Sequence, residues 1–168
     1  MHIGQGTVIG AGVVVYPNVK IGKNCIIEAN TVLGNAGFGV VKNRSGNWMI
    51  PHVGGVIIGN NVRVGALTTI DRATIGSTII GNFCKIDDKV HIAHNSVIGE
   101  RNIICAGANV GGSVTIGDDC WLGLGCNIMQ KVYVGDRTTI GIGANVFHDT
   151  YRQANMIGYP AKKMPGSQ

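Results

Sequence analysis

The sequence predicts an all-β fold in which short parallel strands wind into stacked triangular coils, a parallel β-helix. Three observations predict it. An aliphatic residue recurs every six positions over most of the chain, and all 21 members of this series are Ile, Val or Leu. The residue after it is glycine in 13 of the 21 units. Neither the two-residue period of a flat strand nor the 3.6-residue period of a helix produces a six-residue repeat with a corner.

Three such units, or 18 residues, close one coil, and successive coils stack about 4.8 Å apart as parallel strands. The series therefore predicts about seven coils, with aliphatic side chains forming ladders along the axis. We expect the β-helix domain to span residues 1–150 and a C-terminal tail to span 151–168. Prolines in the tail exclude a long helix there. The series consists of Ile3, Ile9, Val15, Ile21, Ile27, Leu33, Ile58, Val64, Ile70, Ile80, Ile86, Ile92, Ile98, Ile104, Val110, Ile116, Leu122, Ile128, Val134, Ile140 and Val146.

Two insertions interrupt the repeat. Residues 35–55 form the longer one, which includes Phe38 and Trp48 and must project sideways as a loop. Long loops in compact folds are commonly functional, although a loop that only packs against a neighbouring subunit stays an open alternative. The shorter insertion, residues 72–75, predicts a bulge next to Asp71.

Charge and cysteine content limit the classes of function. The net charge of +5 is scattered, which favours a small phosphate-bearing ligand over a nucleic acid. No signal-peptide pattern and no apolar run long enough for a bilayer is present, so we expect a cytoplasmic protein without a membrane span. Four of the five cysteines, Cys25, Cys84, Cys120 and Cys126, fall at the small inward position of a unit. They are predicted to be buried thiols and neither disulfides nor zinc ligands.

The stretch KIDDKVHIAHNSVIGE contains the main catalytic candidate, His94. Its side chain is expected to point outward, because it is the third residue of the unit that starts at Ile92. One coil is 18 residues, so Gly112 lies directly above it. A titratable base beside an unobstructed backbone N–H is the minimum for acyl transfer, because it supplies a proton acceptor and a donor for an oxyanion. From spacing alone, a solvated surface histidine remains the alternative.

The segments GFGV (residues 37–40), IPHVGGVIIGNNVRVGALTTIDRATI and KIDDKVHIAHNSVIG, together with Trp48, closely resemble the UDP-3-O-acylglucosamine N-acyltransferases of lipid A synthesis, the LpxD family. The resemblance implies a left-handed β-helix, whereas the general crossover rule would predict right-handed turns. It also implies that His94 is the general base and that the Gly112 amide is the oxyanion donor. We further expect Asp71 to orient the imidazole and Phe38, Trp48 and Asn95 to bind substrate.

The tail suggests a different acyl donor. Residues 158–163, GYPAKK, resemble the ending of the coenzyme A-dependent hexapeptide acetyltransferases. In addition, we expect neither the N-terminal uridine-binding domain nor the helical extension of the LpxD family, and Lys131 replaces a second histidine of that family. We therefore predict acetyl-CoA or another acyl-CoA as co-substrate, with no metal. The expected donor-binding residues are Gly125, Lys131, Gly143, Pro160, Lys162 and Lys163.

The leading functional prediction is an N-acyltransferase, of acetyl-transferring type, that moves an acyl group from acyl-CoA to the amine of a nucleotide-linked amino sugar in surface polysaccharide synthesis. The resembling families imply a homotrimer with active sites between subunits, and no nucleic acid partner is expected. One alternative is an LpxD-like enzyme that uses acyl carrier protein. Others are a metalloenzyme like the γ-carbonic anhydrases, which lacks support because their closely spaced histidine pair is missing, and a non-catalytic scaffold.

Overall fold

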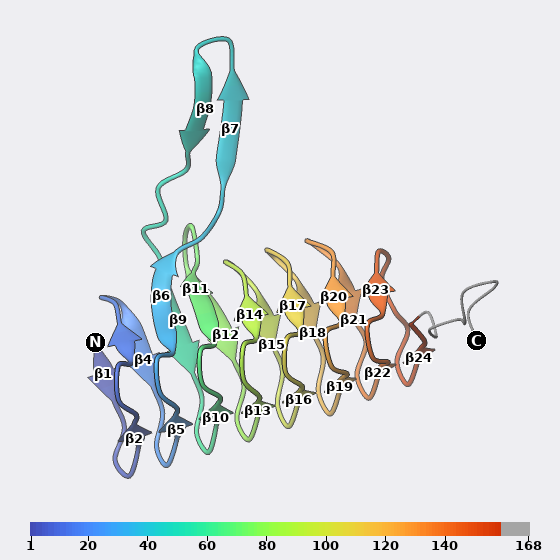
Figure 1. Cartoon of the computed structure of the whole chain (residues 1–168), viewed down its shortest axis with the longest axis horizontal. Coiled ribbons are helices and arrows are strands. Elements are labelled where there is room, and N and C mark those ends of the chain that lie inside the picture. The colour runs from blue at the N-terminus through green and yellow to red at the C-terminus, as the bar shows by residue number, and fades with distance from the viewer. Residues whose placement is uncertain (159–168) are drawn as a thin grey trace, which may run out of the picture.

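A computed structural model of the chain describes residues 1–158, which contain 24 short strands and no helix. The strands wind into a left-handed parallel β-helix, as predicted, with the coils side by side along one axis (Figure 1). Since this part of the chain holds no helix, it also holds none with the length and apolar character needed to cross a bilayer.

Three parallel sheets form the faces of the solenoid. The first contains β1 (His2–Ile3), β4 (Val19–Ile21), β9 (Gly55–Ile58), β12 (Ser77–Ile80), β15 (Val97–Ile98), β18 (Thr115–Ile116) and β21 (Tyr133–Val134). The second contains β2 (Val8–Ile9), β5 (Ile26–Ile27), β10 (Arg63–Val64), β13 (Lys85–Ile86), β16 (Ile103–Ile104), β19 (Trp121–Leu122), β22 (Thr139–Ile140) and β24 (Asn155–Met156). The third contains β3 (Val14–Val15), β6 (Val32–Ala36), β11 (Thr69–Arg72), β14 (His91–Ile92), β17 (Asn109–Val110), β20 (Asn127–Ile128) and β23 (Asn145–Val146).

The pairing register follows the repeat. Regular coils pair residues 18 apart, as His91 does with Asn109. The offset rises to 37 across the long insertion, where Lys20 pairs with Ile57, and to 22 across the short one, where Thr69 pairs with His91. A register shift in β11 between Ile70 and Asp71 marks the bulge that was predicted there. Both insertions are therefore absorbed without changing which face each later strand occupies.

The aliphatic series forms the core. From Ile21 to Val146 its members are buried, and successive coils stack them into one continuous cluster. At the N-terminal end Ile3 and Ile9 are more than a third exposed, because only one neighbouring coil covers them. Each fully buried Ile or Leu side chain contributes about 1.5–3 kcal/mol to folding, so the ladders account for much of the stability of this thin molecule.

The second inward residue of each unit is small, and in many units its polar tip bonds to the next coil. The hydroxyl of Thr31 donates to the carbonyl oxygen of Gly65 at 2.8 Å, and the Asn102 amide donates to that of Gly117 at 2.8 Å. Thiols do the same, as for Cys84 with Gly99 at 3.1 Å. All five cysteines are free, and the four predicted to be buried are buried. The position thus combines close packing with satisfaction of corner carbonyls.

The corners impose two backbone requirements. The third residue after the inward aliphatic has a positive φ in unit after unit, as at Asn95 (61°) and Gly125 (62°). Asparagine and glycine are the residues that adopt this left-handed region most readily. The residue directly after the aliphatic packs against backbone of the next coil; a Cβ on Gly123 would lie 2.8 Å from the carbonyl carbon of Gly141. At position 123 glycine is therefore required by this close contact and not by its φ angle.

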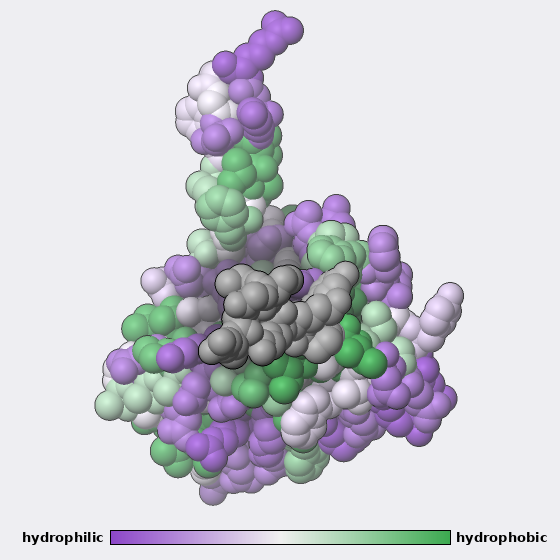
Figure 2. Space-filling view, turned by 45° about the vertical axis from the view of Figure 1, so that its right-hand side comes forward, coloured by the Kyte–Doolittle hydropathy of each residue, from purple (hydrophilic) through white to green (hydrophobic). Residues whose placement is uncertain are grey.

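The long insertion projects from one edge as an antiparallel hairpin of β7 (Val40–Asn43) and β8 (Gly46–Met49) (Figure 1). Its tip is hydrophilic and its stem hydrophobic (Figure 2). At the other end of the chain, β24 pairs with β22, so the second sheet continues into the segment predicted as a tail. Pro160, Lys162 and Lys163 lie outside the described residues.

Candidate active site

His94 lies in the turn that follows β14, half-buried, with its main chain fixed by the coil above. The Ser113 N–H donates to the His94 carbonyl oxygen at 2.9 Å, so the two turns stack in the predicted register. Gly112 lies against the imidazole: a Cβ built on it would be 2.8 Å from His94 Nε2 and 2.9 Å from Cε1. Any side chain at residue 112 would therefore occupy the space next to this nitrogen.

The backbone N–H of Gly112 makes no hydrogen bond to any of the described residues. It lies in the turn, beyond the strand β17, and its carbonyl oxygen accepts a bond from the Lys131 N–H at 2.9 Å. A donor without a partner next to a histidine nitrogen can stabilise negative charge that develops during a reaction. The geometry thus brings together the pair of groups that the 18-residue spacing predicted.

The tautomer of His94 follows from Asn95. The Asn95 Oδ1 accepts a bond from the Thr74 N–H at 2.9 Å, and its Nδ2 donates to the carbonyl oxygen of Ile75 at 3.1 Å. These two partners fix the amide orientation, so the 3.1 Å contact of Oδ1 with His94 Nδ1 requires an N–H on Nδ1. In neutral His94 the lone pair is then on Nε2, the nitrogen that faces Gly112. Asn95, which is expected to bind substrate, also contacts the ring of this histidine.

Asp71 is buried (7% exposed) beside three histidines. Its Oδ2 lies 3.9 Å from His91 Nε2, while His91 Nδ1 contacts the hydroxyl of Thr69 at 2.7 Å. Burial raises the pKa of the Asp71 carboxyl, and His91, His94 and His52 would partly oppose this rise whenever they are protonated. Asp71 makes no hydrogen bond to His94 among the described residues, so it acts on that ring through charge and not through a direct bond.

His52 and His91 belong to the same cluster, and reasoning from the sequence did not identify them as site residues. The His52 and His94 rings are 4.9 Å apart between centroids and nearly perpendicular, at 69°. The sequence held one indication of each role. His91 falls in register with Thr69, beside Asp71, and His52 lies near the end of the long insertion. In residues 1–158 no group of three or more His, Cys, Asp or Glu side chains is arranged to hold a metal ion.

The long insertion covers the His94 ring with its first arm. A Cβ on Gly37 would lie 2.7 Å from the Cβ of His94 and 2.8 Å from its Cδ2. The aromatic residues predicted to bind substrate lie further out: Phe38 is 82% exposed, and Trp48, on the hairpin, is 58% exposed. Within one chain these two side chains are therefore free to meet a ligand or a neighbouring subunit.

The predicted donor-binding residues divide between two corners. Lys131 stacks above Gly112 on the His94 corner, and Gln130, Lys131, Phe147 and His148 line a hollow of about 590 Å³ there. Gly125 and Gly143 lie in turns between the second and third sheets, whereas His94 lies between the third and the first. One chain does not bring these glycines to the base.

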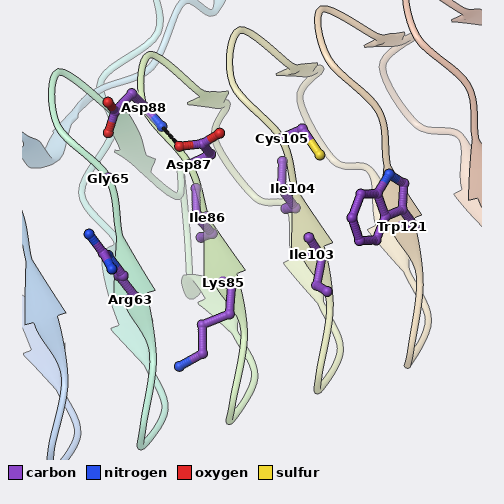
Figure 3. A pocket seen from close by; sticks show the side chains of 10 residues that line it. All are labelled: Arg63, Gly65, Lys85, Ile86, Asp87, Asp88, Ile103, Ile104, Cys105 and Trp121. Carbon is purple, nitrogen blue, oxygen red and sulfur yellow. Dashed lines mark hydrogen bonds between the residues drawn. The ribbon is translucent and has the colours of Figure 1, made fainter.

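A separate hollow of about 480 Å³ lies on the second sheet, across β10, β13, β16 and β19 (Figure 3). Arg63 and Lys85 lie on one side of it, Ile103 in its middle and Trp121 on the other side. Trp121 points outward, as predicted, and is 48% exposed. This surface and the His94 corner are on different parts of the coil, so only a second subunit could bring them together.

Comparison with known proteins agrees with this architecture. The signature described as bacterial transferase hexapeptide (six repeats) matches residues 1–35 and 77–112, and the hexapeptide repeat of succinyl-transferase matches 113–147. Among solved structures, UDP-N-acetylglucosamine acyltransferase of Francisella novicida is 27% identical with a TM-score of 0.65, covering 88% of this chain and 54% of that one. LpxA of Acinetobacter baumannii, at 24% identity, shares the fold with a TM-score of 0.76 over 94% of this chain and 60% of its own.

Curated relatives include UDP-3-O-acylglucosamine N-acyltransferase 2 of Legionella pneumophila, 43% identical over 109 residues, or 65% of this chain and 28% of that protein. UDP-3-O-acylglucosamine N-acyltransferase of Coxiella burnetii is 47% identical over 102 residues, or 60% and 30%. The chain thus spans less than a third of the length of these relatives. The prediction of acetyl-CoA or another acyl-CoA as co-substrate is wrong, because enzymes of this kind take acyl chains linked to acyl carrier protein.

Proposed function

The chain belongs to the bacterial hexapeptide-repeat transferases, and from this premise we propose that it is an N-acyltransferase of the LpxD type. In this proposal it moves an acyl chain from acyl carrier protein to the amine of UDP-3-O-acylglucosamine in lipid A synthesis. The single observation that carries it is the position of His94 Nε2 next to the Gly112 amide, which has no hydrogen-bond partner among the described residues. The identity of 43–47% to curated relatives supports the substrate class.

The reaction uses these two groups in sequence. The amine nitrogen attacks the thioester carbonyl carbon while His94 Nε2 takes one of its protons. The carbonyl oxygen gains negative charge, and the Gly112 N–H donates a hydrogen bond to it. The tetrahedral intermediate then collapses: the carbon–sulfur bond breaks, the amide forms, and the thiolate receives the proton from His94. Atoms and charge balance without a cofactor.

Asn95 and Asp71 support the base in different ways. The amide oxygen of Asn95 holds the Nδ1–H, which keeps the lone pair on Nε2 directed at the reacting nitrogen. When His94 becomes a cation during attack, the buried carboxylate of Asp71 favours that charge. The arrangement resembles other catalytic histidines, in which one ring nitrogen is oriented so that the other can exchange a proton.

The proposal includes a homotrimer with an active site between neighbouring subunits. The exposed aromatic residues support it: Phe38 and Trp48 of the long insertion and Trp121 on the second sheet are large apolar surfaces without a partner in one chain. Large exposed aromatic side chains mark interaction surfaces. Light scattering after gel filtration should give three times the mass of 17.6 kDa. A monomer that is fully active at dilute concentration would contradict the shared site.

The experiment that tests the function measures acyl transfer from acyl carrier protein to UDP-3-O-acylglucosamine. His94→Ala should lower kcat by about 10²–10⁴-fold, the usual contribution of a general base, while the melting temperature stays close to that of the wild type. His2→Ala, which removes an exposed histidine of the first coil, is the matched control and should keep full activity. If folded His94→Ala retained more than about a tenth of the rate, far above that range, the proposed mechanism would be wrong.

A further inference from the structure

His52 lies near the end of the long insertion, and one hydrogen bond of its buried ring fixes its tautomer. Its Nδ1 lies 2.8 Å from the carbonyl oxygen of Ile50, and only 7% of the residue is exposed. A carbonyl oxygen can only accept a hydrogen bond, so Nδ1 carries the proton. The other nitrogen, Nε2, therefore holds a lone pair in the neutral ring.

This Nε2 is a buried side-chain nitrogen without a hydrogen-bond partner, the one such atom in the part of the chain that the structure describes. Buried polar atoms in native proteins are nearly always paired, because leaving one unpaired destabilises the fold. An unpaired buried acceptor next to a reactive group is therefore a position where a ligand supplies the missing donor.

His52 lies at the His94 site. The two rings contact each other nearly perpendicularly, with 4.9 Å between centroids. The chain after His52 is tied to the bulge of the coil, since the N–H groups of Val53 and Gly54 donate to the carbonyl oxygens of Thr74 and Ala73, both at 3.0 Å. The ring is thus held next to the coil and not on the projecting hairpin of β7 and β8.

Two glycines in the first arm of the long insertion, Gly37 and Gly39, cover this pair of rings. A Cβ on Gly37 would press on His94, and a Cβ on Gly39 would lie 3.2 Å from the Cε1 of His52. Residues 37–39 therefore lie over both histidines at once. A ligand must therefore displace this arm to reach the buried Nε2 of His52.

Building on the proposed function, we propose that His52 Nε2 binds the acceptor sugar by accepting a hydrogen bond from one of its hydroxyl or amine groups. The chemistry is restrictive, because a lone pair can bond an O–H or N–H and repels phosphate and carbonyl oxygens. His52 then fixes the sugar ring beside His94, and entry of the sugar moves the arm of residues 37–39 aside.

The test measures binding of UDP-3-O-acylglucosamine by calorimetry without acyl donor. His52→Leu removes the acceptor atom and should weaken binding by about 10- to 100-fold, the usual effect of leaving a buried bond unmade. His52→Gln offers an amide oxygen in its place and should stay within about threefold of the wild type. Analogues in which the amine, the 4-hydroxyl or the 6-hydroxyl is replaced by hydrogen identify the bonded group: one of them should bind the wild type weakly and lose nothing further in His52→Leu.

Three outcomes overturn the inference. If wild type and His52→Leu bind the sugar equally well, the proposed hydrogen bond does not exist. If His52→Leu and His52→Gln lose the same affinity, His52 has only a packing role. If the wild type does not bind the sugar at all, both proposals are contradicted. If His52→Leu does not fold, His52→Phe removes the acceptor while keeping a ring. Because the readout is affinity, it is independent of His94: folded His94→Ala should bind the sugar normally, and its turnover tests the proposed function separately.

Discussion

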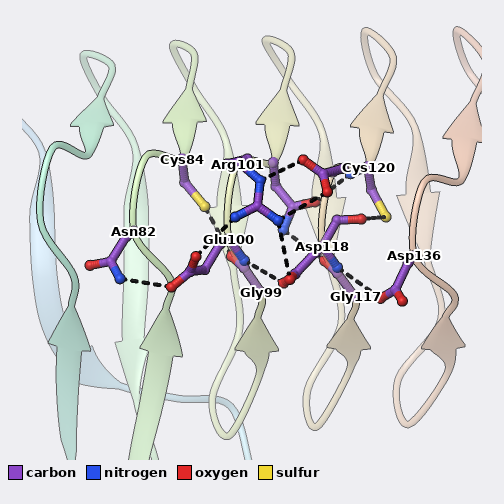
Figure 4. Close-up of polar contacts among 11 residues, drawn as sticks. Asn82, Cys84, Gly99, Glu100, Arg101, Gly117, Asp118, Cys120 and Asp136 are labelled. Carbon is purple, nitrogen blue, oxygen red and sulfur yellow. Dashed lines mark hydrogen bonds and ion pairs between the residues drawn. The ribbon is translucent and has the colours of Figure 1, made fainter.

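Two polar clusters lie on different corners of the same coils, and they differ in how completely their atoms are paired. The first surrounds Arg101, whose guanidinium contacts the carboxylates of Glu100, Asp118 and Asp119 at 2.7–3.3 Å (Figure 4). The carboxylates of this corner also accept backbone N–H groups from the neighbouring coil; Asp118 accepts from Glu100 at 2.8 Å. This cluster is exposed. One arginine faces three carboxylates, but each of these carboxylates accepts at least two hydrogen bonds.

In the second cluster, around His94, some buried polar groups have no matching partner among the described residues. Within residues 1–158, the Asp71 carboxylate is buried among histidines without an arginine or lysine partner, and the Nε2 of His52 is unpaired. Keeping polar atoms buried and unpaired costs stability, and such costs are concentrated at functional sites. The repeat thus builds corners with similar backbones, and incomplete pairing distinguishes the corner that is proposed to act on a ligand.

Among the substitutions that test this difference between the two corners, Gly112→Ala should lower kcat the most. The new methyl group would lie 2.8 Å from His94 Nε2, so it must displace the base or the amide beside it. We expect kcat to fall by about 10²–10³-fold, as for loss of an oxyanion donor. The substitution leaves the core ladder unchanged, so thermal unfolding should be nearly that of the wild type. An active Gly112→Ala enzyme would show that the turn does not contact the reacting atoms.

Asn95→Gly tests the orientation of the base. Asn95 has φ of 61°, a conformation that glycine adopts freely, so this substitution removes the side chain without backbone strain. Without the amide oxygen at 3.1 Å from Nδ1, the imidazole can take the wrong tautomer. We expect kcat to fall by roughly tenfold, less than the 10²–10⁴-fold contribution of the base itself, with KM for the sugar unchanged. Asn95→Asp keeps the acceptor and should retain most of kcat; equal kcat values for wild type and Asn95→Gly would refute the orienting role.

Asp71→Asn tests the buried charge through stability. Burial raises the pKa of Asp71 from its ordinary 3.8, so the native state holds this proton more tightly than the unfolded chain does. Raising the pH above about 4 therefore destabilises the wild type relative to Asp71→Asn, and the difference grows until the native carboxyl is ionised. Urea unfolding at pH 4, 6 and 8 measures it. Glu28→Gln, at a carboxylate that is less buried than Asp71 and paired with Arg63, is the control and should not show this loss of stability as the pH rises. A difference independent of pH would mean that Asp71 is not strained by burial.

The regular part of the site could be predicted from the sequence because the coil converts spacing into position. A repeat of 18 residues per coil is enough to place Gly112 over His94 and to bury Cys84 or Cys120, without any knowledge of side-chain contacts. The same arithmetic placed the bulge near Asp71, since the repeat resumes four residues late.

The residues that the sequence did not reveal are those outside this register. His52 belongs to an insertion, and nothing in its spacing says which loop residue folds back onto the coil. The orienting role of Asn95 depends on two bonds to the bulge, at Thr74 and Ile75, which has no counterpart in other coils. The donor prediction was wrong for a related reason: it used a short motif at 158–163, largely beyond the described coils, against a match that covers most of the repeats.

Arg101→Gln should have the smallest effect, and it tests the cluster in which the polar groups are paired. The side chain is almost half exposed and its ion pairs compete with water, so their net contribution is small and is screened by salt. We expect a slight fall in melting temperature at low ionic strength that vanishes at high salt, and an unchanged kcat. Two of the carboxylates left behind keep a hydrogen bond, since Asp118 accepts the Glu100 N–H and Glu100 accepts the Asn82 amide, and this limits their repulsion. A large loss of activity in folded Arg101→Gln would show that complete pairing does not mark a structural corner in this protein.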